Sequence, residues 1–300
     1  MNRSILKSAI AVTRPRFLLL VPACVTLGIA TALLASPELS MFRIVIVLIG
    51  AVAAHMSVNA LNEYLDFRSG LDFRTVRTPF SGGTGTLPSH PEAAPAALIT
   101  GLSTLGIALA VGLYVSVVAG WLVWVPALIG VLTIVLYTGP IQRNPVSCLL
   151  APGIGFGFCM VTGTHYALTG GFTAAALAAS LIPLFLVSNL LLLNQFPDVE
   201  ADRTAGRCHF PIRIGRASSA RIFTAFLIAP FTIIVLAVMI GLFPRGALAG
   251  LFMVIPAARL NRGVTENADN LGHLQPFMGL NVAVTLLTPV LTAVGIYLTR

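Results

Sequence analysis

Long apolar runs of roughly helical length follow one another along almost the whole chain, and short segments rich in polar residues separate them. A run of about twenty apolar residues is long enough to cross the hydrocarbon core of a bilayer. Successive runs of this kind are typical of polytopic membrane proteins and not of soluble domains. The pattern predicts an all-α bundle of nine transmembrane helices in a single membrane domain covering residues 1–300, with helices at 17–35, 41–65, 94–116, 120–138, 147–168, 172–196, 219–241, 246–259 and 275–298.

The composition supports this interpretation. The chain is 57% hydrophobic and only 9% charged, with a mean hydropathy of +0.93, whereas a soluble domain carries about 25% charged residues. The first apolar run is too long for the core of a signal peptide, which indicates a retained first span. The four cysteines form no CxxC pair, so we expect small core residues and neither a disulfide framework nor a zinc site.

Basic residues fall mainly on one side of the predicted bundle. Fifteen of the 18 lysines and arginines lie before the first helix or in alternate connections, and only Arg43, Arg245 and Arg300 lie on the other side. The positive-inside rule then predicts a cytoplasmic N-terminus (residues 1–16), cytoplasmic active-site loops at 66–93 and 197–218, and a place in the inner membrane. Because this asymmetry explains most of the net charge of +8, the expected partner is the lipid bilayer. A nucleic acid is not expected, and no obligate protein partner is indicated.

The few acidic residues gather at two helix ends. Six of the ten form two clusters at the predicted cytoplasmic ends of the second and sixth helices: Glu63, Asp66 and Asp72, and then Asp198, Glu200 and Asp202. An ionised carboxylate in mid-membrane costs about 2.5–3.5 kcal/mol, so such residues are usually functional. A pair of solvated acidic loops is the alternative, but it does not explain the spacing of the residues.

In the first cluster, one helix face carries a polar stripe, because His55, Asn59, Asn62 and Asp66 follow one another at intervals of four, three and four residues. The pair Ser69-Gly70 predicts the end of this helix and a turn that brings Asp72 back toward Asp66.

The second cluster has the same design. Asn194, Asp198 and Asp202 follow one another at intervals of four residues and so share a face. Pro197 lacks a backbone donor, which predicts a kink or short break just before Asp198.

Carboxylate and amide oxygens on two helix ends suit Mg²⁺, which often completes its shell with substrate phosphates. The predicted metal ligands are Asn62, Glu63, Asp66, Asp72, Asn194, Asp198 and Asp202, and the four aspartates among them are also the predicted catalytic residues. The predicted diphosphate-binding residues are Arg68, Arg77 and Arg207, since a guanidinium matches phosphate oxygens; anchoring at the membrane surface is the alternative. Residues 78–88, TPFSGGTGTLP, are either an anion-binding loop or a flexible linker.

These motifs are familiar as a set. NEYLDFRSGLD with RTPFSGG, and later NQFPDVEADRTAGR, resemble the two aspartate-rich motifs of the UbiA superfamily of membrane prenyltransferases. The resemblance implies Mg²⁺-dependent transfer of a polyprenyl group from an allylic diphosphate to a small aromatic acceptor, with release of diphosphate. LYTGP and GTHYALTG resemble the branch that prenylates 1,4-dihydroxy-2-naphthoate in menaquinone biosynthesis. Glu63 stands where the family motif usually has aspartate.

Other polar residues carry weaker predictions. His55, Asn59, Tyr137 and Tyr166 are candidate contacts of the acceptor or of an allylic cation, with interhelical bonding or interfacial anchoring as the alternatives. His165 is expected to be a satisfied buried histidine, whereas His90, His209 and His273 are expected to be solvated loop residues.

Two other functions stay open on the sequence. A UbiA-type enzyme acting on hydroxybenzoate, homogentisate or haem would share the same motifs. A secondary transporter also carries intramembrane carboxylates, but its site usually lies near the midplane, on broken helices.

Overall fold

The computed structural model describes residues 3–75 and 77–300, and within these residues it contains helices and turns but no strands. The α-helices are α1 (Arg3–Ala11), α2 (Leu20–Ala35), α3 (Met41–Ser69), α4 (Thr86–Ser89), α5 (Ala94–Ala119), α6 (Trp124–Leu136), α7 (Pro145–Gly153), α8 (Gly163–Thr169), α9 (Ala174–Thr204), α10 (Phe210–Ile214), α11 (Arg216–Met239), α12 (Val254–Asn267) and α13 (Leu271–Thr299). A π-helical segment, Ile154–Thr162, joins α7 to α8, and the 3₁₀ segment Arg245–Met253 precedes α12.

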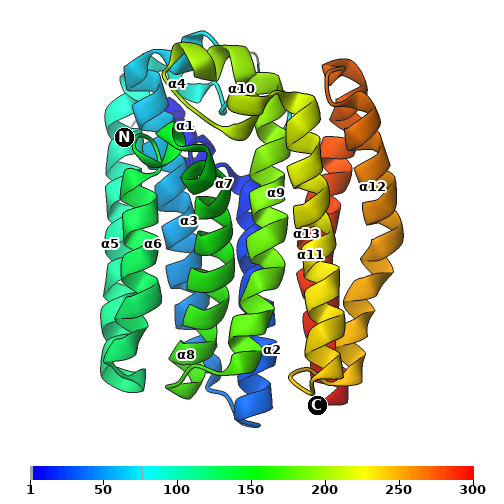
Figure 1. Cartoon of the computed structure of the whole chain (residues 1–300). Helices are drawn as coiled ribbons and strands as arrows, with labels where there is room; N and C mark the ends of the chain where they lie inside the picture. The colour runs from blue at the N-terminus through cyan, green and yellow to red at the C-terminus, as the bar shows by residue number, and fades with distance from the viewer. Residues whose placement is uncertain (1–2, 76) are drawn as a thin grey trace.

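The long helices form one bundle and lie roughly along a common direction (Figure 1). Helix α3 packs against α5, α9 packs against α11 and the π-helical segment, and α13 packs against α2. The short helices α4 and α10 lie together at the end of the bundle that also holds the N-terminus, and the C-terminus lies at the opposite end (Figure 1). The predicted all-α membrane bundle is confirmed.

The count of nine spans is not confirmed. Seven helical segments in the described part of the chain are long and apolar enough to cross a membrane: Pro15–Ala35, Met41–Ser69, Pro91–Ala119, Pro145–Thr169, Ala174–Thr204, Arg216–Met239 and Leu271–Thr299. The predicted span at 120–138 is a shorter apolar helix, Trp121–Leu136. The predicted span at 246–259 lies in a helical segment that continues to Asn267, where Arg259, Asn261 and Arg262 lower its apolar character.

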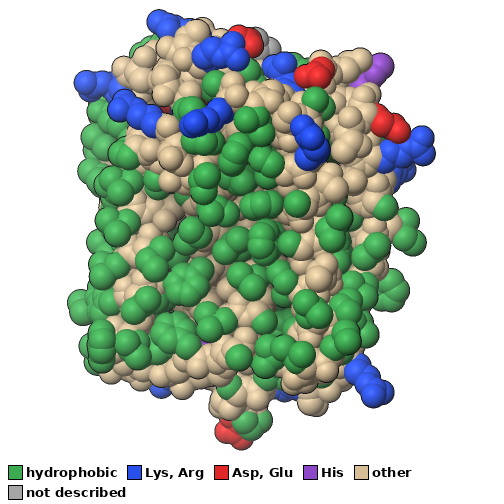
Figure 2. Space-filling model, in the orientation of Figure 1, with side chains coloured by type: hydrophobic (Ala, Val, Ile, Leu, Met, Phe, Trp, Pro, Cys, Tyr) green, Lys and Arg blue, Asp and Glu red, His purple; other side chains and the backbone are tan. Residues whose placement is uncertain are grey.

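The surface follows the predicted division of charge. On the face shown in Figure 2, hydrophobic side chains cover the length of the bundle, and most Lys and Arg side chains collect at the end near α4 and α10. This end is called the polar end below. Apolar sides between polar ends are what a helical membrane protein requires.

Helix α3 ends as predicted. Its last residue is Ser69, and Gly70 follows with a φ of 77°, the left-handed conformation that lets a chain leave a helix. The next turn, Leu71–Phe73, carries a buried Asp72 back against the helix end.

Helix α9 differs from the prediction. It continues through Pro197 to Thr204, so there is no break before Asp198, and residues 197–204 of the predicted loop are helical. Proline removes one helical hydrogen bond. The flanking Phe196 and Val199 are buried in the bundle, and this packing supports the helix on both sides of the proline.

Candidate active site

A cavity of about 380 Å³ runs through the bundle between α3, α5, α6, the π-helical segment and α9. Its lining residues on α3 extend from Val47 to Asp66, which corresponds to about 28 Å of helix axis at ~1.5 Å per residue. The cavity therefore spans most of a bilayer core in depth. It joins the polar end of the bundle to an apolar chamber that reaches Val115 and Trp124.

The polar end of the cavity collects the four aspartates of the two predicted clusters, whereas Glu63 and Glu200 lie outside the lining. Its charged and amide side chains are Arg14, Asn59, Asn62, Asp66, Asp72, Gln142, Asn194, Gln195, Asp198, Asp202 and Arg207. Ser81, Gly82 and Gly83, from the glycine-containing segment, also line it. The structure thus brings the ends of α3 and α9 together around one space.

Arg207 connects the two acid-bearing helices. Its Nη2 lies 2.5 Å from Asp66 Oδ1, and its Nη1 lies 2.9 Å from Asp202 Oδ1. Burial disfavours the guanidinium charge, but the two carboxylates outweigh that effect and raise the pKa of Arg207. A permanently charged guanidinium therefore lies between α3 and α9 at the mouth of the cavity.

The carboxylates differ in how many of their oxygens already have partners. Asp66 also accepts a bond from Asn62 Nδ2 (3.1 Å), and Asp202 contacts His209 Nε2 (3.0 Å), so all four of their oxygens are paired. Among the described residues that line the cavity, three other buried oxygens have no hydrogen-bond partner: Asp72 Oδ2, Asn194 Oδ1 and Asp198 Oδ1.

Such orphaned oxygens are costly unless a cation or a donor satisfies them. They are hard oxygen donors of the kind Mg²⁺ prefers, so the residues present fit that ion. Within the described residues, no three His, Cys, Asp or Glu side chains already surround a common metal position. The Arg207 guanidinium instead holds Asp66 and Asp202.

Glu63, a predicted metal ligand, is already bonded to other parts of the chain. It is fully buried outside the cavity lining and accepts bonds from Arg14 Nε (2.8 Å), Thr84 N (2.9 Å) and Thr84 Oγ1 (2.8 Å). These donors already satisfy its two oxygens. Glu63 therefore anchors Arg14 and the glycine-containing segment over the cavity.

Two of the three predicted diphosphate-binding arginines lie away from the cavity lining. Arg68 is exposed and donates to Tyr64 Oη (3.2 Å). Arg77 is exposed and donates to the Asp72 carbonyl (3.0 Å), so its bond supports the turn that carries Asp72. Arg207 alone of the three lines the cavity.

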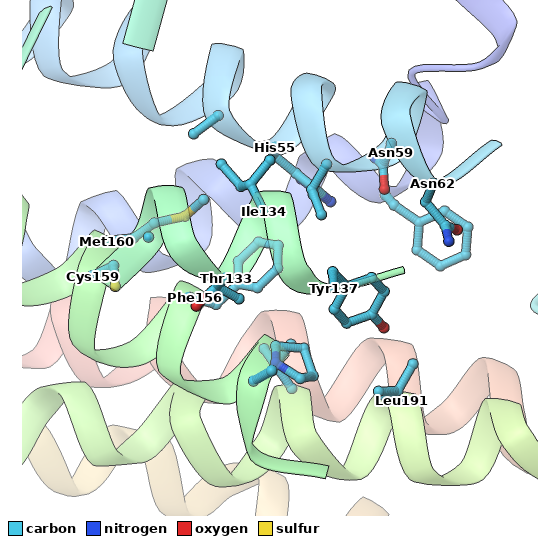
Figure 3. Close-up of a pocket in the computed structure, with 18 of the residues that line it drawn as sticks. His55, Asn59, Asn62, Thr133, Ile134, Tyr137, Phe156, Cys159, Met160 and Leu191 are labelled. Atoms are coloured by element: carbon cyan, nitrogen blue, oxygen red, sulfur yellow. The ribbon is translucent and has the colours of Figure 1, made fainter. Parts of the chain in front are cut away.

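The middle of the cavity is lined by aromatic and weakly polar groups. His55 meets the face of Phe156 edge-on, with ring centroids 4.7 Å apart at 89°, and its Nδ1 is buried without a partner. Tyr137 also lines the cavity, and Figure 3 shows these side chains around the same space. Asn59 donates to the Thr13 carbonyl (2.9 Å).

Tyr166 is outside the cavity lining. It is buried against Phe172, with ring centroids 4.8 Å apart, in an apolar cluster that includes Val47 and Val115. Tyr166 therefore packs within the bundle beside the cavity. His165 is buried between Thr31 Oγ1 (3.1 Å) and Thr173 Oγ1 (3.3 Å), which confirms the prediction of a satisfied histidine.

Two cavity residues are missing from the sequence prediction. His209 is only 1% exposed, so its assignment as a solvated loop residue is wrong. Arg14 reads in the sequence as one more basic residue of the N-terminus, yet it lines the cavity and contacts Glu63 and Asn62 Oδ1 (3.3 Å). It has a φ of 52°, a conformation that costs an L-residue about 1 kcal/mol or more. Only the contacts made in the folded chain show that Arg14 and His209 belong to the cavity.

Replacing Arg14 by glutamine is expected to lower the free energy of unfolding by about 3 kcal/mol, because it leaves Glu63 buried without its cation. Thermal unfolding in detergent would measure the loss. The double variant Arg14→Gln, Glu63→Gln is the control, and it should recover most of the stability. Equal losses in the single and double variants would contradict the role given to this ion pair.

Comparisons with known proteins identify the family and the fold. The sequence model of the UbiA prenyltransferase family matches residues 19–271. A 1,4-dihydroxy-2-naphthoate octaprenyltransferase of Bacillus subtilis (strain 168) is 28% identical over 173 residues. That match covers 57% of this chain and 54% of the relative, so it spans about half the length of that protein.

Solved structures share the fold over nearly the whole chain. A UbiA homologue from Aeropyrum pernix K1 has a TM-score of 0.65 at 18% identity, covering 92% of this chain and 97% of that one. A UbiA homologue from Archaeoglobus fulgidus, described as bound to GPP and Mg²⁺, has a TM-score of 0.61 at 13% identity, covering 96% and 99%. At these identities the likeness shows a common fold and no more.

Proposed function

The chain belongs to the UbiA prenyltransferase family, and we propose that it transfers a polyprenyl group from an allylic diphosphate to a small aromatic acceptor, releasing diphosphate. One observation carries the proposal. A single cavity joins a mouth that holds Arg14, Arg207 and orphaned acidic oxygens to a deep apolar chamber. A prenyl diphosphate has a multiply charged head and a long apolar tail, so its polarity matches that of the mouth and the chamber.

The arginines at the mouth bind the head of the donor. Arg207 has five N–H donors, of which two make the bonds to Asp66 and Asp202. Arg14 adds a second guanidinium at the same mouth. Charge-assisted bonds of this kind are the strongest for phosphate oxygens. They also stabilise the negative charge that grows on the diphosphate as the C–O bond to the prenyl group breaks.

The apolar chamber orients the tail and excludes water. Its walls on α5 and α6 include Leu109, Val111 and Val131, which offer no nucleophile to an allylic cation. Phe156 and Tyr137 also line the cavity, and the face of an aromatic ring favours positive charge on a nearby carbon. A carbon of the electron-rich acceptor ring then bonds to the allylic carbon, and the ring loses a proton or CO₂.

The family and the orphaned oxygens also imply Mg²⁺. Asp72, Asn194 and Asp198 would hold it through the free oxygens, and Asp66 would join them by exchanging its bond to Arg207 for the cation, while Asp202 stays bonded to Arg207. When bound, the ion supplies Lewis-acid neutralisation of the diphosphate leaving group. A UbiA homologue from A. fulgidus, described as bound to GPP and Mg²⁺, is consistent with the use of Mg²⁺ in this family.

Asp72 gives the site a pH dependence. Burial, with help from the Glu63 and Asp66 carboxylates, raises the pKa of Asp72 to about 7, although Arg14 and Arg77 act in the opposite direction. Because this value lies above the unfolded one, the neutral acid stabilises the fold at low pH, and that contribution is lost as the pH rises to about 7. Cation binding depends on pH in the opposite direction. It requires the ionised carboxylate of Asp72, so the affinity for the cation increases as the pH rises.

Mg²⁺ is therefore expected to raise the melting temperature more at pH 8 than at pH 6. Below about pH 7 its affinity should fall by up to roughly tenfold per pH unit, because a proton competes for Asp72. Thermal unfolding at a series of Mg²⁺ concentrations measures this, and Asp72→Asn is the control in which the pH dependence should flatten. The same Mg²⁺ effect at both pH values in the natural protein would contradict the assignment.

For the acceptor we propose 1,4-dihydroxy-2-naphthoate. The similarity to the B. subtilis relative supports this choice, as do the LYTGP and GTHYALTG segments. We further propose that the polar end faces the cytoplasm and that the chain lies in the inner membrane, as the distribution of basic residues supports (Figure 2).

An acceptor screen tests the proposed function. The purified protein in detergent is given a labelled polyprenyl diphosphate, Mg²⁺ and one of four acceptors: 1,4-dihydroxy-2-naphthoate, 4-hydroxybenzoate, homogentisate or haem. Release of diphosphate and a prenylated product with the naphthoate alone is the expected result. Product with another acceptor would reassign the branch. The absence of both diphosphate release and product with every acceptor would reject the prenyltransferase function for this chain.

A further inference from the structure

His209 occupies an unusual position for a residue in a polar connection. Helix α9 ends at Thr204, and Gly206, with a φ of 74°, reverses the chain in the left-handed conformation that glycine tolerates. The turn is fixed by bonds from Arg207 N to the Asp202 carbonyl (3.1 Å) and from Cys208 N to the Gln142 carbonyl (2.8 Å). As a result, the side chains at 207 and 209 both return to Asp202.

Asp202 is held from two sides. His209 Nε2 lies 3.0 Å from Asp202 Oδ2, and Arg207 Nη1 lies 2.9 Å from Asp202 Oδ1. An ionised carboxylate only accepts hydrogen bonds, so Nε2 is the ring nitrogen that carries the proton. Asp202 is 4% exposed and His209 is 1% exposed, and a buried bond of this kind fixes the orientation of both groups.

The Asp202 carboxylate in turn orients Arg207. Within the described part of the chain, the guanidinium is anchored at two side chains, Asp202 and Asp66, which come from different helices. Asp66 is also a candidate to bind the cation that accompanies the donor. When Asp66 turns to that cation, Asp202 is the remaining anchor of the guanidinium, and His209 is what keeps this carboxylate from rotating.

We propose that His209 is a positioning residue for diphosphate binding, which acts by fixing Asp202 so that the Arg207 guanidinium points into the mouth of the cavity. This inference rests on the proposed function. It assigns His209 no contact with the substrate. Because the effect of His209 passes through Asp202 and Arg207, replacing His209 should not weaken diphosphate binding further once Arg207 has been removed.

The test measures binding of inorganic diphosphate, in the presence of Mg²⁺, to the full chain in detergent by isothermal titration calorimetry. His209→Leu keeps the buried volume but removes the donor, and it should weaken diphosphate binding about tenfold, as is typical for residues that orient a ligand-binding group. His209→Gln offers an amide N–H in place of Nε2–H and should stay within about threefold of the natural protein. His209→Ala serves as a second removal variant if the leucine is not accommodated.

His165→Gln is the matched control. His165 is also fully buried and bonded to two side chains, Thr31 and Thr173, but it lies outside the cavity lining. Its replacement should lower the melting temperature without changing the affinity for diphosphate. In steady-state transfer, His209→Leu should raise the KM for the prenyl diphosphate more than it lowers kcat, since it disturbs binding of the donor head.

A double variant tests whether His209 acts through Arg207. Arg207→Ala and Arg207→Ala, His209→Leu should bind diphosphate with equal affinity, because His209 acts only through Arg207. A further tenfold loss in the double variant would overturn the inference, as would His209→Leu binding as well as the natural protein. Failure of the natural protein to bind diphosphate at all is a separate outcome, which rejects the proposed function and this inference with it.

Discussion

Replacing Asp198 by asparagine is expected to reduce prenyl transfer by roughly a thousandfold, the loss seen when a group that stabilises developing charge is removed. Asp198 Oδ1 is buried in the mouth of the cavity and has no hydrogen-bond partner. Asn194 precedes it by one helical turn and carries another orphaned oxygen. Asparagine keeps the shape of the side chain and removes the charge, so it tests the charge alone.

The same substitution should not destabilise the protein. A carboxylate with one buried, unpartnered oxygen is a cost to folding, and removal of its charge leaves the melting temperature unchanged or higher. Transfer of a labelled prenyl group and thermal unfolding should be measured on the same preparation. Arg143→Ala is the control, because Arg143 is exposed and outside the cavity lining. Full transfer activity in Asp198→Asn would end the assignment of this carboxylate to donor binding.

Replacing Arg207 by alanine is expected to have the largest effect on stability, with a loss of about 3–5 kcal/mol in the absence of Mg²⁺. The change leaves Asp66 and Asp202, from two different helices, facing one another without the cation that joins them. Mg²⁺ should restore more stability to this variant than it adds to the natural protein, since it replaces the missing positive charge.

Arg68→Ala provides the control for that experiment. Arg68 is exposed and makes its one side-chain hydrogen bond to Tyr64, so its loss should change the free energy of unfolding by no more than about 0.5 kcal/mol. Thermal unfolding of both variants with and without Mg²⁺ gives the comparison. An Arg207→Ala protein as stable as Arg68→Ala without Mg²⁺ would show that Arg207 does not hold the two helices together.

The sequence alone was sufficient to predict the features that depend on helical periodicity and on long apolar runs. The four-three-four spacing from His55 to Asp66 places these residues along one cavity wall, and Ser69-Gly70 ends the helix so that Asp72 folds back. The apolar runs give the bundle for the same reason, because a bilayer selects helices by length and hydropathy. Pro197 misled the prediction, since packing of the surrounding helix outweighed the one hydrogen bond it removes.

The sequence was insufficient where function depends on which polar atoms are already paired. Glu63 and Asp72 are equivalent oxygen donors in the motif, yet the fold gives Glu63 three donors and leaves Asp72 Oδ2 with none. Arg14 and His209 reach the cavity through a strained backbone and a reversed turn. Neither feature has a periodic signature, so only the folded chain distinguishes them from other basic or loop residues.

A structure of the protein with Mg²⁺ and an unreactive polyprenyl thiodiphosphate tests the central claim most directly. The account predicts the diphosphate at the mouth of the cavity, within hydrogen-bonding reach of Arg14 and Arg207 and beside Asp198, with the tail running down the chamber toward Trp124. A diphosphate bound elsewhere, or a tail that leaves the chamber empty, would contradict it.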